Sequence, residues 1–472
     1  LPANSAASGG FDVANSVRMN RGSTDHLRRT NNTGETSNKI GTYSGWLKRS
    51  TIALDGMMFE GKDLDANNYT QIYFQATGKL TVYGSGTMDI VSTALFRDPT
   101  AWYHVCVAID TTQGTAANRV KIYVNGVQVT SLTNGNGDGV EYPDQNDVIY
   151  FAVNGDQQAI GIREDGALLW NGYFSEVVYI DGTQLTPTSF GEFDEDSGIW
   201  KPIKVSGLTF GNNGCYLDFQ DSSALGNVVA GRTAVDFTVT NLTAVDQSTD
   251  TCTNNFATLN PLMPLGSNIT YSDGNLTITP GTSDYKTTAS TIAVSSGKWY
   301  AEFKAVSGHN GSTDVSIGIV GADTFLASTG SKAMSAYTNA FSYGSGGLVK
   351  QYNNSTIRTD ATYTNDDIIG IAVDMDNLKL YWSKNGSFQN SGDPTSGASG
   401  TGAVAITAGQ PYYICATTIS SGGVKIFSAN FGSPPYSESG GETDGDGYGN
   451  FAHAVPSGYF ALNTKNLAEY GG

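Results

Sequence analysis

The segment EFDEDS, which begins at Glu192, is the part of the sequence closest to a paired-carboxylate catalyst. Side chains two residues apart on a strand point to the same face, so Glu192 and Asp194 could flank one glycosidic bond as nucleophile and acid. Position 197, where a third carboxylate would complete an E-x-D-x-x-E pattern, is a serine, and the segment follows the turn-like TPTSFG. We therefore expect a solvated acidic loop rather than a catalytic strand.

Nucleophilic and phosphate chemistry have even less support. The sequence has no G-x-S-x-G elbow and no H-E-x-x-H, and its Gly-Lys pairs are not followed by Ser or Thr. The four histidines are far apart and lie in unrelated contexts: His26, His104, His309 and His453. His104 alternates with apolar neighbours in AWYHVCVAI, which is typical of a half-buried strand residue rather than a base. We expect neither a catalytic triad nor zinc catalysis.

Calcium is the one metal for which the sequence offers candidate ligands. TDGDGYGN places Asp444, Asp446 and Asn450 close together, and oxygen ligands at alternating positions suit this cation. Tyr448 stands where a third oxygen side chain would be wanted. A second candidate is NGNGDG, with Asn134, Asn136 and Asp138. A plain hydrophilic turn is the favoured interpretation of both segments.

Composition indicates the fold class and excludes several partners. Charged residues make up 15% of the 472-residue chain, Gly occurs 58 times and aromatic residues reach 11%. Sparse charge with many turn formers and aromatic residues is typical of all-β structure. The formal net charge of −18 argues against nucleic acid and anionic membrane surfaces, which both attract clustered Lys and Arg. No apolar segment approaches the roughly 20 residues of a membrane helix, so we expect no membrane insertion.

Cysteine spacing and the N-terminus carry weaker signals. The four cysteines are widely separated and form no C-x-x-C pair, which predicts mainly buried free thiols: Cys106, Cys215, Cys252 and Cys415. The N-terminal stretch LPANSAASGGFDV lacks the basic and apolar regions of a signal peptide.

Short strand-like segments separated by Gly, Asn and Asp recur along most of the chain. Asn-Gly at 125–126 is a strong hairpin signal, because both central residues of a type I′ turn need positive φ. We expect adjacent antiparallel strands over 119–123 and 127–132. A second Asn-Gly at 385–386, in KLYWSKNGSF, predicts a similar hairpin with a slightly longer loop. The weak pattern between the two strand series predicts two β domains of similar size.

Three ordered runs in the first half carry a resemblance to a known family. FRDPTAWYHVCVAIDTTQGTAANRVKIYVNGVQV, NGYFSEVVYIDGTQLTPTSFGEF and GIWKPIKVSG resemble the laminin-G-like, concanavalin A-type lectin domains of marine phage structural proteins, over residues 16–219. In the second half, SSGKWYAEFKAV, DDIIGIAVDMDNLKLYWSKNGSF and FSANFGSPPY resemble a SPRY (B30.2-like) domain. TDTCTNNFATLNPL and PSGYFALNTKNL are similar to segments that connect and close such pairs in phage tail or virion proteins.

The resemblance implies two antiparallel β-sandwich (jelly-roll) domains in tandem with a short connector. The expected boundaries are 1–222 for the first sandwich, 223–265 for the connector and 266–436 for the SPRY-like sandwich. Residues 437–472 would form a Gly-rich extension packed on the second domain or on a neighbouring subunit.

Exposed aromatic residues are the expected ligand platforms, because sugars stack on aromatic faces. Tyr337, Tyr343 and Tyr352 stand in Gly, Ser or Asn contexts that favour exposure, and SPRY domains bind partners through loops at one end. Covering the core is an equally good interpretation of these three residues. Four tryptophans within strand patterns are expected in the core: Trp46, Trp102, Trp299 and Trp382.

Alternation in KLYWSK places Leu380 and Trp382 inward, with Tyr381 on the opposite face. Any function of this hairpin is therefore expected at Tyr381 or in the loop 384–386.

The leading hypothesis is a non-enzymatic virion protein, in a tail fibre, appendage or capsid decoration. It would lie on the surface of the particle and bind host-surface glycans, other virion proteins or further copies of itself, with no cofactor beyond the calcium considered above. The alternatives are a polysaccharide depolymerase that uses carboxylates and a secreted bacterial adhesin.

Overall fold

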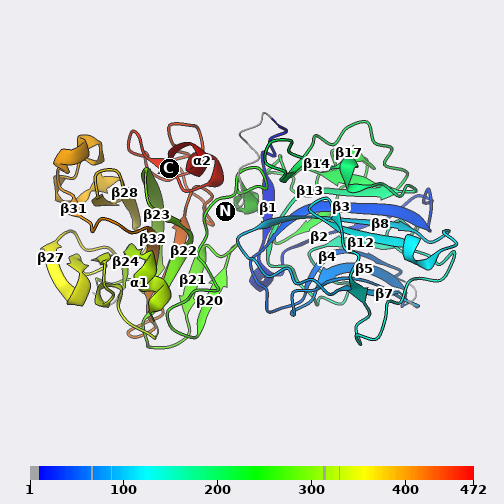
Figure 1. The fold of residues 1–472 in the computed structure, drawn as a ribbon, viewed down its shortest axis with the longest axis horizontal. Helices are drawn as coiled ribbons and strands as arrows, with labels where there is room; N and C mark the ends of the chain where they lie inside the picture. The colour runs from blue at the N-terminus through cyan, green and yellow to red at the C-terminus, as the bar shows by residue number, and fades with distance from the viewer. Residues whose placement is uncertain (1–9, 65–66, 87, 312–314, 329, 472) are drawn as a thin grey trace. The chain divides into compact units, whose positions relative to one another are not determined.

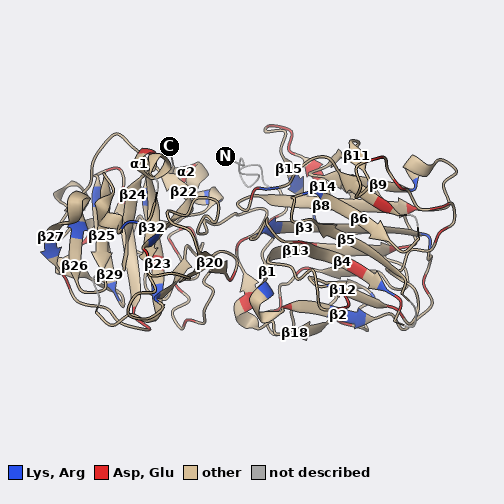
Figure 2. Ribbon diagram, turned by 90° about the horizontal axis from the view of Figure 1, so that it is seen from below, with Lys and Arg blue, Asp and Glu red and all other residues tan. Residues whose placement is uncertain are grey.

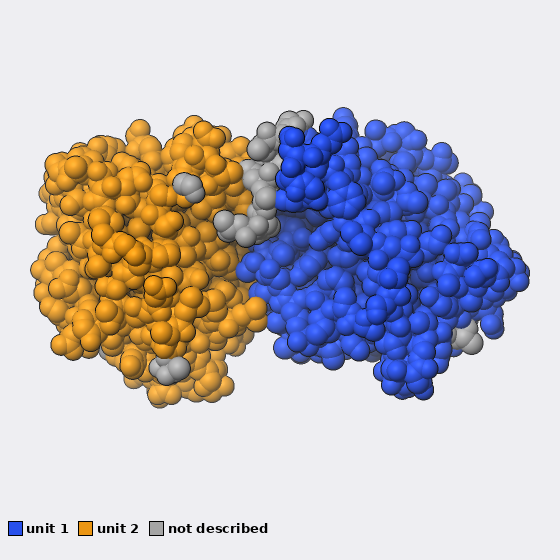
Figure 3. Space-filling view, viewed as in Figure 1, with its two compact units in different colours: residues 1–254 blue, residues 255–472 orange. Residues whose placement is uncertain are grey.

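The chain folds into two compact units, Leu1–Asn254 and Asn255–Gly472 (Figures 1 and 3). This computed structural model describes residues 10–64, 67–86, 88–311, 315–328 and 330–471. Each unit is built from antiparallel sheets around its own apolar core. The expected all-β class with tandem sandwiches is confirmed.

Unit 1 contains two large sheets and a small hairpin. The first sheet has the order β10 (Val127–Gln128), β9 (Val120–Val124), β8 (Trp102–Asp110), β3 (Ile40–Arg49), β13 (Gly172–Asp181), β1 (Ser16–Met19) and β19 (Gln247–Ser248), with β16 (Cys215–Leu217) on β13 and β17 (Ala230–Gly231) on β16. The second sheet has the order β11 (Leu132–Thr133), β7 (Asp89–Ser92), β6 (Leu80–Gly84), β5 (Tyr69–Phe74), β4 (Gly56–Lys62), β12 (Gln157–Ile160), β2 (His26–Thr30) and β18 (Thr238–Thr240). Strands β14 (Gly191–Phe193) and β15 (Trp200–Pro202) form the hairpin.

The outer faces of these two sheets differ in what covers them. Every residue of β13 is buried, because aromatic side chains and the β14–β15 hairpin pack on the outside of the first sheet. Strand β2 instead alternates between partly exposed and buried positions, and β5 and β6 leave Tyr69, Tyr73 and Tyr83 partly exposed. The strands of the second sheet run side by side across unit 1 (Figure 2). Its outer face is therefore the sheet surface of unit 1 that a ligand can reach.

Unit 2 is a sandwich of a nine-stranded and a six-stranded sheet. The larger sheet has the order β20 (Ile269–Ser272), β21 (Thr277–Pro280), β33 (Ile426–Asn430), β23 (Lys298–Ser307), β28 (Ile368–Asp374), β29 (Lys379–Lys384) and β30 (Ser387–Phe388), with β31 (Val404–Ala405) on β29 and β34 (Phe460–Ala461) on β23. The smaller has the order β22 (Lys286–Val294), β32 (Tyr412–Thr418), β24 (Ser316–Gly321), β25 (Ala340–Gly344), β26 (Leu348–Gln351) and β27 (Ser355–Thr359).

Helices are short and peripheral. The α-helices are α1 (Ala322–Ala327) and α2 (Thr464–Tyr470), and the 3₁₀ turns are η2 (Arg21–Ser23), η3 (Ala116–Asn118), η4 (Pro187–Ser189), η5 (Ala244–Asp246), η6 (Met334–Ala336), η7 (Tyr352–Asn354), η8 (Gln389–Ser391) and η9 (Pro394–Ser399). In the described part of the chain, no helix has the length and apolar character needed to cross a membrane.

Both Asn-Gly turns have the predicted geometry. Asn125 and Gly126 have φ of 49° and 78°, and Asn385 and Gly386 have φ of 47° and 79°. The second loop is no longer than the first, because Lys384 pairs directly with the residue after the turn. The strand expected over 127–132 is split: β10 stays with β9, and β11 joins the second sheet.

The segment 223–265 is not the connector that the sequence predicts. Strand β17 pairs with β16, β18 with β2 and β19 with β1, so residues up to Asn254 complete the sheets of unit 1. Residues from Asn255 onward belong to unit 2, where Leu259 and Leu265 are buried. The extension 437–472 packs on unit 2, with β34 parallel to β23 and Phe451 buried in an aromatic cluster.

Candidate functional site

Strand register places a row of polar side chains on the outer face of the second sheet. Phe59, Ile72 and Val82 are paired across β4, β5 and β6 and lie in the core. Because side chains alternate along a strand, the adjacent paired positions point outward. These positions hold Glu60, Gln71 and Tyr83, and the next residue in the row is Asp89 of β7.

A cleft of about 250 Å³ lies over this row. It is lined by Glu60, Lys62, Asn67, Tyr69, Gln71, Tyr83, Arg163, Glu164 and Asp165. These side chains come from β4, β5, β6, the turn before β5 and the loop after β12. The volume is slightly below the roughly 300–1,000 Å³ of sites for drug-sized ligands, so the cleft suits a small ligand or one unit of a chain.

Two tyrosines form one wall of the cleft. The rings of Tyr69 and Tyr83 lie with centroids 5.9 Å apart and an interplanar angle of 27°. Both side chains are partly exposed, so ring surface and hydroxyl groups face the cleft. Burial, and to a lesser extent the neighbouring Tyr83, raises the pKa of Tyr69, so the phenol of Tyr69 is a neutral hydrogen-bonding group at physiological pH.

A buried carboxyl group lies at the floor. Glu60 is 1% exposed. Its Oε1 accepts a hydrogen bond from Gln71 Nε2 at 2.6 Å, and its Oε2 accepts one from the backbone N–H of Glu164 at 2.6 Å. Burial raises the pKa of Glu60 to about 7, although these two hydrogen bonds and Arg28 act in the opposite direction. The floor carboxyl group therefore changes charge near neutral pH.

The opposite wall is the loop 163–168. Arg163 donates to the carboxylate of Asp165 at 2.9 and 2.7 Å, and this guanidinium lowers the pKa of Asp165 to about 2. From β2, Arg28 donates to the backbone carbonyl groups of Arg163 at 2.9 Å and of Glu164 at 3.1 Å. Hydrogen bonds of Arg28 and Glu60 thus hold the loop 163–168 against the second sheet.

Three of the four tyrosines expected as ligand platforms are buried. Tyr337 is 3% exposed, Tyr343 0% and Tyr381 1%. Tyr337 donates to the carbonyl oxygen of Gly330 and Tyr343 to that of Ala361. The ring of Tyr343, on strand β25, lies in the main core of unit 2, and that of Tyr337 lies in a separate apolar cluster with Phe325 and Met334. Glycine- and serine-rich neighbours therefore do not by themselves keep a ring exposed. Tyr352 is 53% exposed, as predicted.

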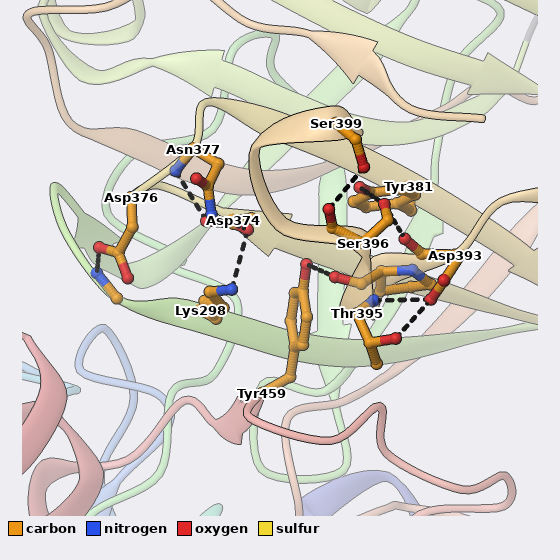
Figure 4. Close-up of polar contacts among 12 residues, drawn as sticks. Lys298, Asp374, Asp376, Asn377, Tyr381, Asp393, Thr395, Ser396, Ser399 and Tyr459 are labelled. Atoms are coloured by element: carbon orange, nitrogen blue, oxygen red, sulfur yellow. Dashed lines mark hydrogen bonds and ion pairs between the residues drawn. The ribbon is translucent and has the colours of Figure 1, made fainter. Parts of the chain in front are cut away.

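Tyr381 points away from the main core, as alternation predicts, but a second layer covers it. Leu380 and Trp382 are fully buried in the sandwich, as predicted. The turn at 393–399 and the C-terminal extension cover the other face (Figure 4). There the hydroxyl of Tyr381 lies 3.4 Å from that of Ser396, and Tyr459 donates to the carbonyl oxygen of Pro394 at 3.2 Å. This face is therefore closed to ligands.

The two segments considered for calcium are organised by the protein itself. Asp444 Oδ1 accepts from the backbone N–H groups of Asp446 and Tyr448, and its Oδ2 accepts from Ala461 and Asn466. In NGNGDG, Asn134 Oδ1 accepts from the backbone N–H groups of residues 136, 137 and 138. Within the described residues, no three His, Cys, Asp or Glu side chains form a metal cluster. Binding of calcium at Asp444, Asp446 and Asn450 stays a prediction.

The acidic segment EFDEDS is more ordered than expected. Glu192 lies on β14 and is 57% exposed, whereas Asp194 is 6% exposed. Lys201 pairs with Asp194 at 3.1 Å and with Glu192 at 3.4 Å. Asp194 also accepts hydrogen bonds from Ser197. Asp194 is thus a buried structural residue and not part of a solvated loop.

The structure brings together one Ser-His pair that sequence spacing does not reveal. Ser44 Oγ lies 2.8 Å from His104 Nε2. Trp200 Nε1 donates to His104 Nδ1 at 3.0 Å, so Nδ1 is the acceptor and Nε2 carries the proton. A nucleophile's base needs the opposite tautomer. His104 is fully buried, and this burial lowers its pKa to about 3, which makes it a neutral core residue.

Sequence reasoning missed the cleft, although one signal was present. YTQIYF alternates Tyr, Gln and Tyr at positions 69, 71 and 73 with core residues between them. Alternation alone predicts a polar, aromatic face on this strand. Alternation along β5 does not show that Glu60 and Tyr83 lie beside that face, because they belong to the neighbouring strands β4 and β6.

One family model and several solved structures are similar to parts of this chain. Residues 21–188 match the family model described as the concanavalin A-like lectin/glucanases superfamily. No curated protein matches the chain. The SPRY domain of human HERC1 is 15% identical, over 36% of this chain and 96% of that one, with a TM-score of 0.29. Domains LG4-5 of the mouse laminin α1 chain are 12% identical, over 88% and 84%, with a TM-score of 0.28.

A third solved structure is a Bacteroides ovatus protein described as carbohydrate binding, which is 15% identical over 49% of this chain and 60% of that one, with a TM-score of 0.33. The family match covers β2 to β13, and it includes every residue that lines the cleft. The part of unit 1 that holds the cleft is thus similar to this lectin/glucanase superfamily.

Proposed function

We propose that unit 1 binds a neutral glycan in the cleft on its second sheet. The observation that carries this proposal is the Tyr69–Tyr83 wall, which lines the same cleft as the polar side chains of Asn67 and Glu164. Rings pack against the C–H faces of a sugar, and amide and carboxyl groups bond its hydroxyls. The match of residues 21–188 to a lectin superfamily supports the same ligand class.

The charges favour an uncharged sugar. Three carboxyl groups and two cationic groups line the cleft, and the cation of Arg163 is already paired with Asp165. Residues 1–254 hold 28 Asp and Glu against 16 Lys and Arg, a net charge of −12. A polyanionic glycan would be repelled by such a surface.

We propose binding without catalysis. Glycoside hydrolysis needs two carboxyl groups that reach the same bond from opposite sides. Glu60 is almost fully covered and its two oxygens already accept hydrogen bonds, and Asp165 is paired with Arg163. Glu192 and Asp194 are held by Lys201. Steady release of new reducing ends from a polysaccharide would overturn this part of the proposal.

For the biological setting we propose a virion structural or adhesion protein of a phage, on the particle surface. The sequence resemblance described above supports this setting. Host-surface polysaccharide would be the partner of unit 1, and other virion proteins or further copies of the chain would be partners of unit 2.

The experiment is a binding screen with matched tyrosine variants. Purified protein is tested against immobilised dextran, mannan, galactan and alginate. Tyr83→Ala should weaken binding to the neutral polysaccharide by tenfold or more, which corresponds to about 1.4 kcal/mol. Tyr352→Ala, which removes an exposed tyrosine from unit 2, should leave affinity unchanged. Preferential binding to alginate, or equal loss in both variants, would contradict the proposal.

A further inference from the structure

Glu60 joins the floor of the cleft to the loop 163–168, which forms its opposite wall. One carboxyl oxygen accepts from Gln71 on β5, and the other accepts from the backbone of Glu164 in the loop 163–168. Both distances are 2.6 Å, which is short for N–H donors, and hydrogen bonds to an ionised acceptor are the shorter and stronger ones. The side chain is 1% exposed, so water cannot readily replace either donor.

Protonation of this carboxyl group cannot preserve both bonds. An ionised carboxylate accepts at both oxygens, whereas a protonated one turns one oxygen into an O–H donor. That O–H would face an N–H group, because both partners of Glu60 are donors. Either the side-chain amide of Gln71 must rotate so that its oxygen faces Glu60, or the backbone N–H of Glu164 must move away from the carboxyl group. A buried N–H group left unpaired destabilises the protein, which favours movement of the exposed loop.

The charged and titratable groups that face Glu60 come from several elements. Arg28 of β2 and Lys62 of β4 are cationic, and Tyr69 and Tyr83 lie on β5 and β6. The loop adds Glu164 and the ion pair of Arg163 and Asp165. Glu60 itself titrates at about pH 7 because of its burial. His26, on the same face of β2, titrates on the acid side of its usual range because burial lowers its pKa.

We propose that the Glu60 carboxylate is a proton-sensitive latch: while ionised it holds the loop 163–168 against the second sheet together with Arg28. Its protonation removes the Glu60 attachment, loosens this wall and weakens ligand binding. Glu60 is a positioning residue in this scheme, because it acts through Gln71 and the loop. The effect on ligand binding rests on the proposed function, whereas the latch itself does not.

The ligand-free experiment is amide hydrogen exchange of the full chain, followed by mass spectrometry of peptides that cover 160–169. Glu60→Gln offers one acceptor and one donor in place of two acceptors, so it mimics the protonated acid. At pH 8 we expect the loop of the variant to exchange at least tenfold faster than that of the wild type. At pH 5.5 the two proteins should exchange at similar rates. Equal exchange at pH 8 would overturn the latch.

A second variant distinguishes the roles of the two hydrogen-bond donors to Glu60, the side chain of Gln71 and the backbone of Glu164. Gln71→Leu removes the floor donor, so a protonated Glu60 can turn its O–H toward the vacated side and still accept from Glu164. The loop should then stay protected at both pH values. His26→Gln, on the same face of the sheet, should keep the wild-type pH profile. Loss of protection in Gln71→Leu at pH 5.5 only would contradict the mechanism.

The binding arm uses dextran, mannan and galactan at pH 8 and pH 6. If only the ionised form binds, the apparent Kd should rise about tenfold between these values, since Glu60 titrates at about pH 7. Failure of all three polysaccharides to bind would refute the proposed function and leave the exchange result to decide on the latch. Binding of equal strength at both pH values would overturn the inference.

Discussion

Replacement of Glu60 by Gln makes a quantitative prediction about stability. Burial raises the pKa of Glu60 from 4.5 to about 7. A carboxyl group with a raised pKa contributes stability that is full below pH 4.5 and is lost as pH rises through 7. A tenfold change in acid dissociation corresponds to about 1.4 kcal/mol, so the loss between pH 4 and pH 8 is about 3 kcal/mol. Glu60→Gln does not titrate and avoids this loss.

The assay is thermal unfolding of the full chain at both pH values. In a domain of about 250 residues, 1 kcal/mol corresponds to about 2–4 °C in Tm. The Tm of Glu60→Gln relative to wild type should therefore rise by about 6–12 °C between pH 4 and pH 8 in the transition of unit 1. Comparison of the two pH values cancels any fixed cost of the substitution. Glu164→Gln, on the exposed loop, is the control and should show a difference of less than about 2 °C. A pH-independent difference for Glu60→Gln would refute the reasoning.

Three further predictions concern other buried polar groups. Lys48 and Asp250 form an ion pair at 2.8 Å with side chains 2% and 1% exposed. Asp250→Ala should cost about 3–5 kcal/mol in denaturant unfolding, since it removes the carboxylate that pairs with the buried ammonium group of Lys48, and a cost below about 1 kcal/mol would contradict this. Calcium chloride or a chelator should shift the Tm by less than about 1 °C, because the Asp444 carboxylate already accepts four hydrogen bonds. A larger rise in Tm with calcium would contradict this and support a metal site at Asp444. His104→Gln should lose less stability than wild type between pH 6.5 and pH 3. Burial lowers the pKa of His104 to about 3 in the fold, so over this range acid protonates the imidazole of the unfolded chain and favours unfolding of the wild type. Parallel acid denaturation curves of the two proteins would show that His104 is not buried as a neutral ring.

The sequence predicts strand-level features of this protein well. Alternation in KLYWSK places Leu380 and Trp382 inward, and the structure confirms both. The Asn-Gly turns have positive φ at both central residues, as the chemistry of the turn requires. These features depend on residues close together in the chain, so local pattern is sufficient to predict them.

The cleft is formed by residues that are far apart in the sequence, so local sequence patterns do not predict it. Tyr343 and Tyr69 stand in similar polar contexts, yet only Tyr69 reaches a cleft, because strand β25 packs inward and the second sheet of unit 1 leaves β5 open. Glu60 meets Gln71 across 11 positions and Glu164 across 104. Pairing over such separations is set by sheet order, which the sequence does not state.

The most direct test of the glycan cleft is a footprint of the bound ligand. Hydrogen exchange is measured with and without oligosaccharides of the neutral polysaccharide that binds best among dextran, mannan and galactan. Protection should appear in peptides covering 60–85 and 160–169, and it should be absent from peptides covering 348–359 around Tyr352. Protection confined to unit 2, with the second sheet of unit 1 unchanged, would contradict the account.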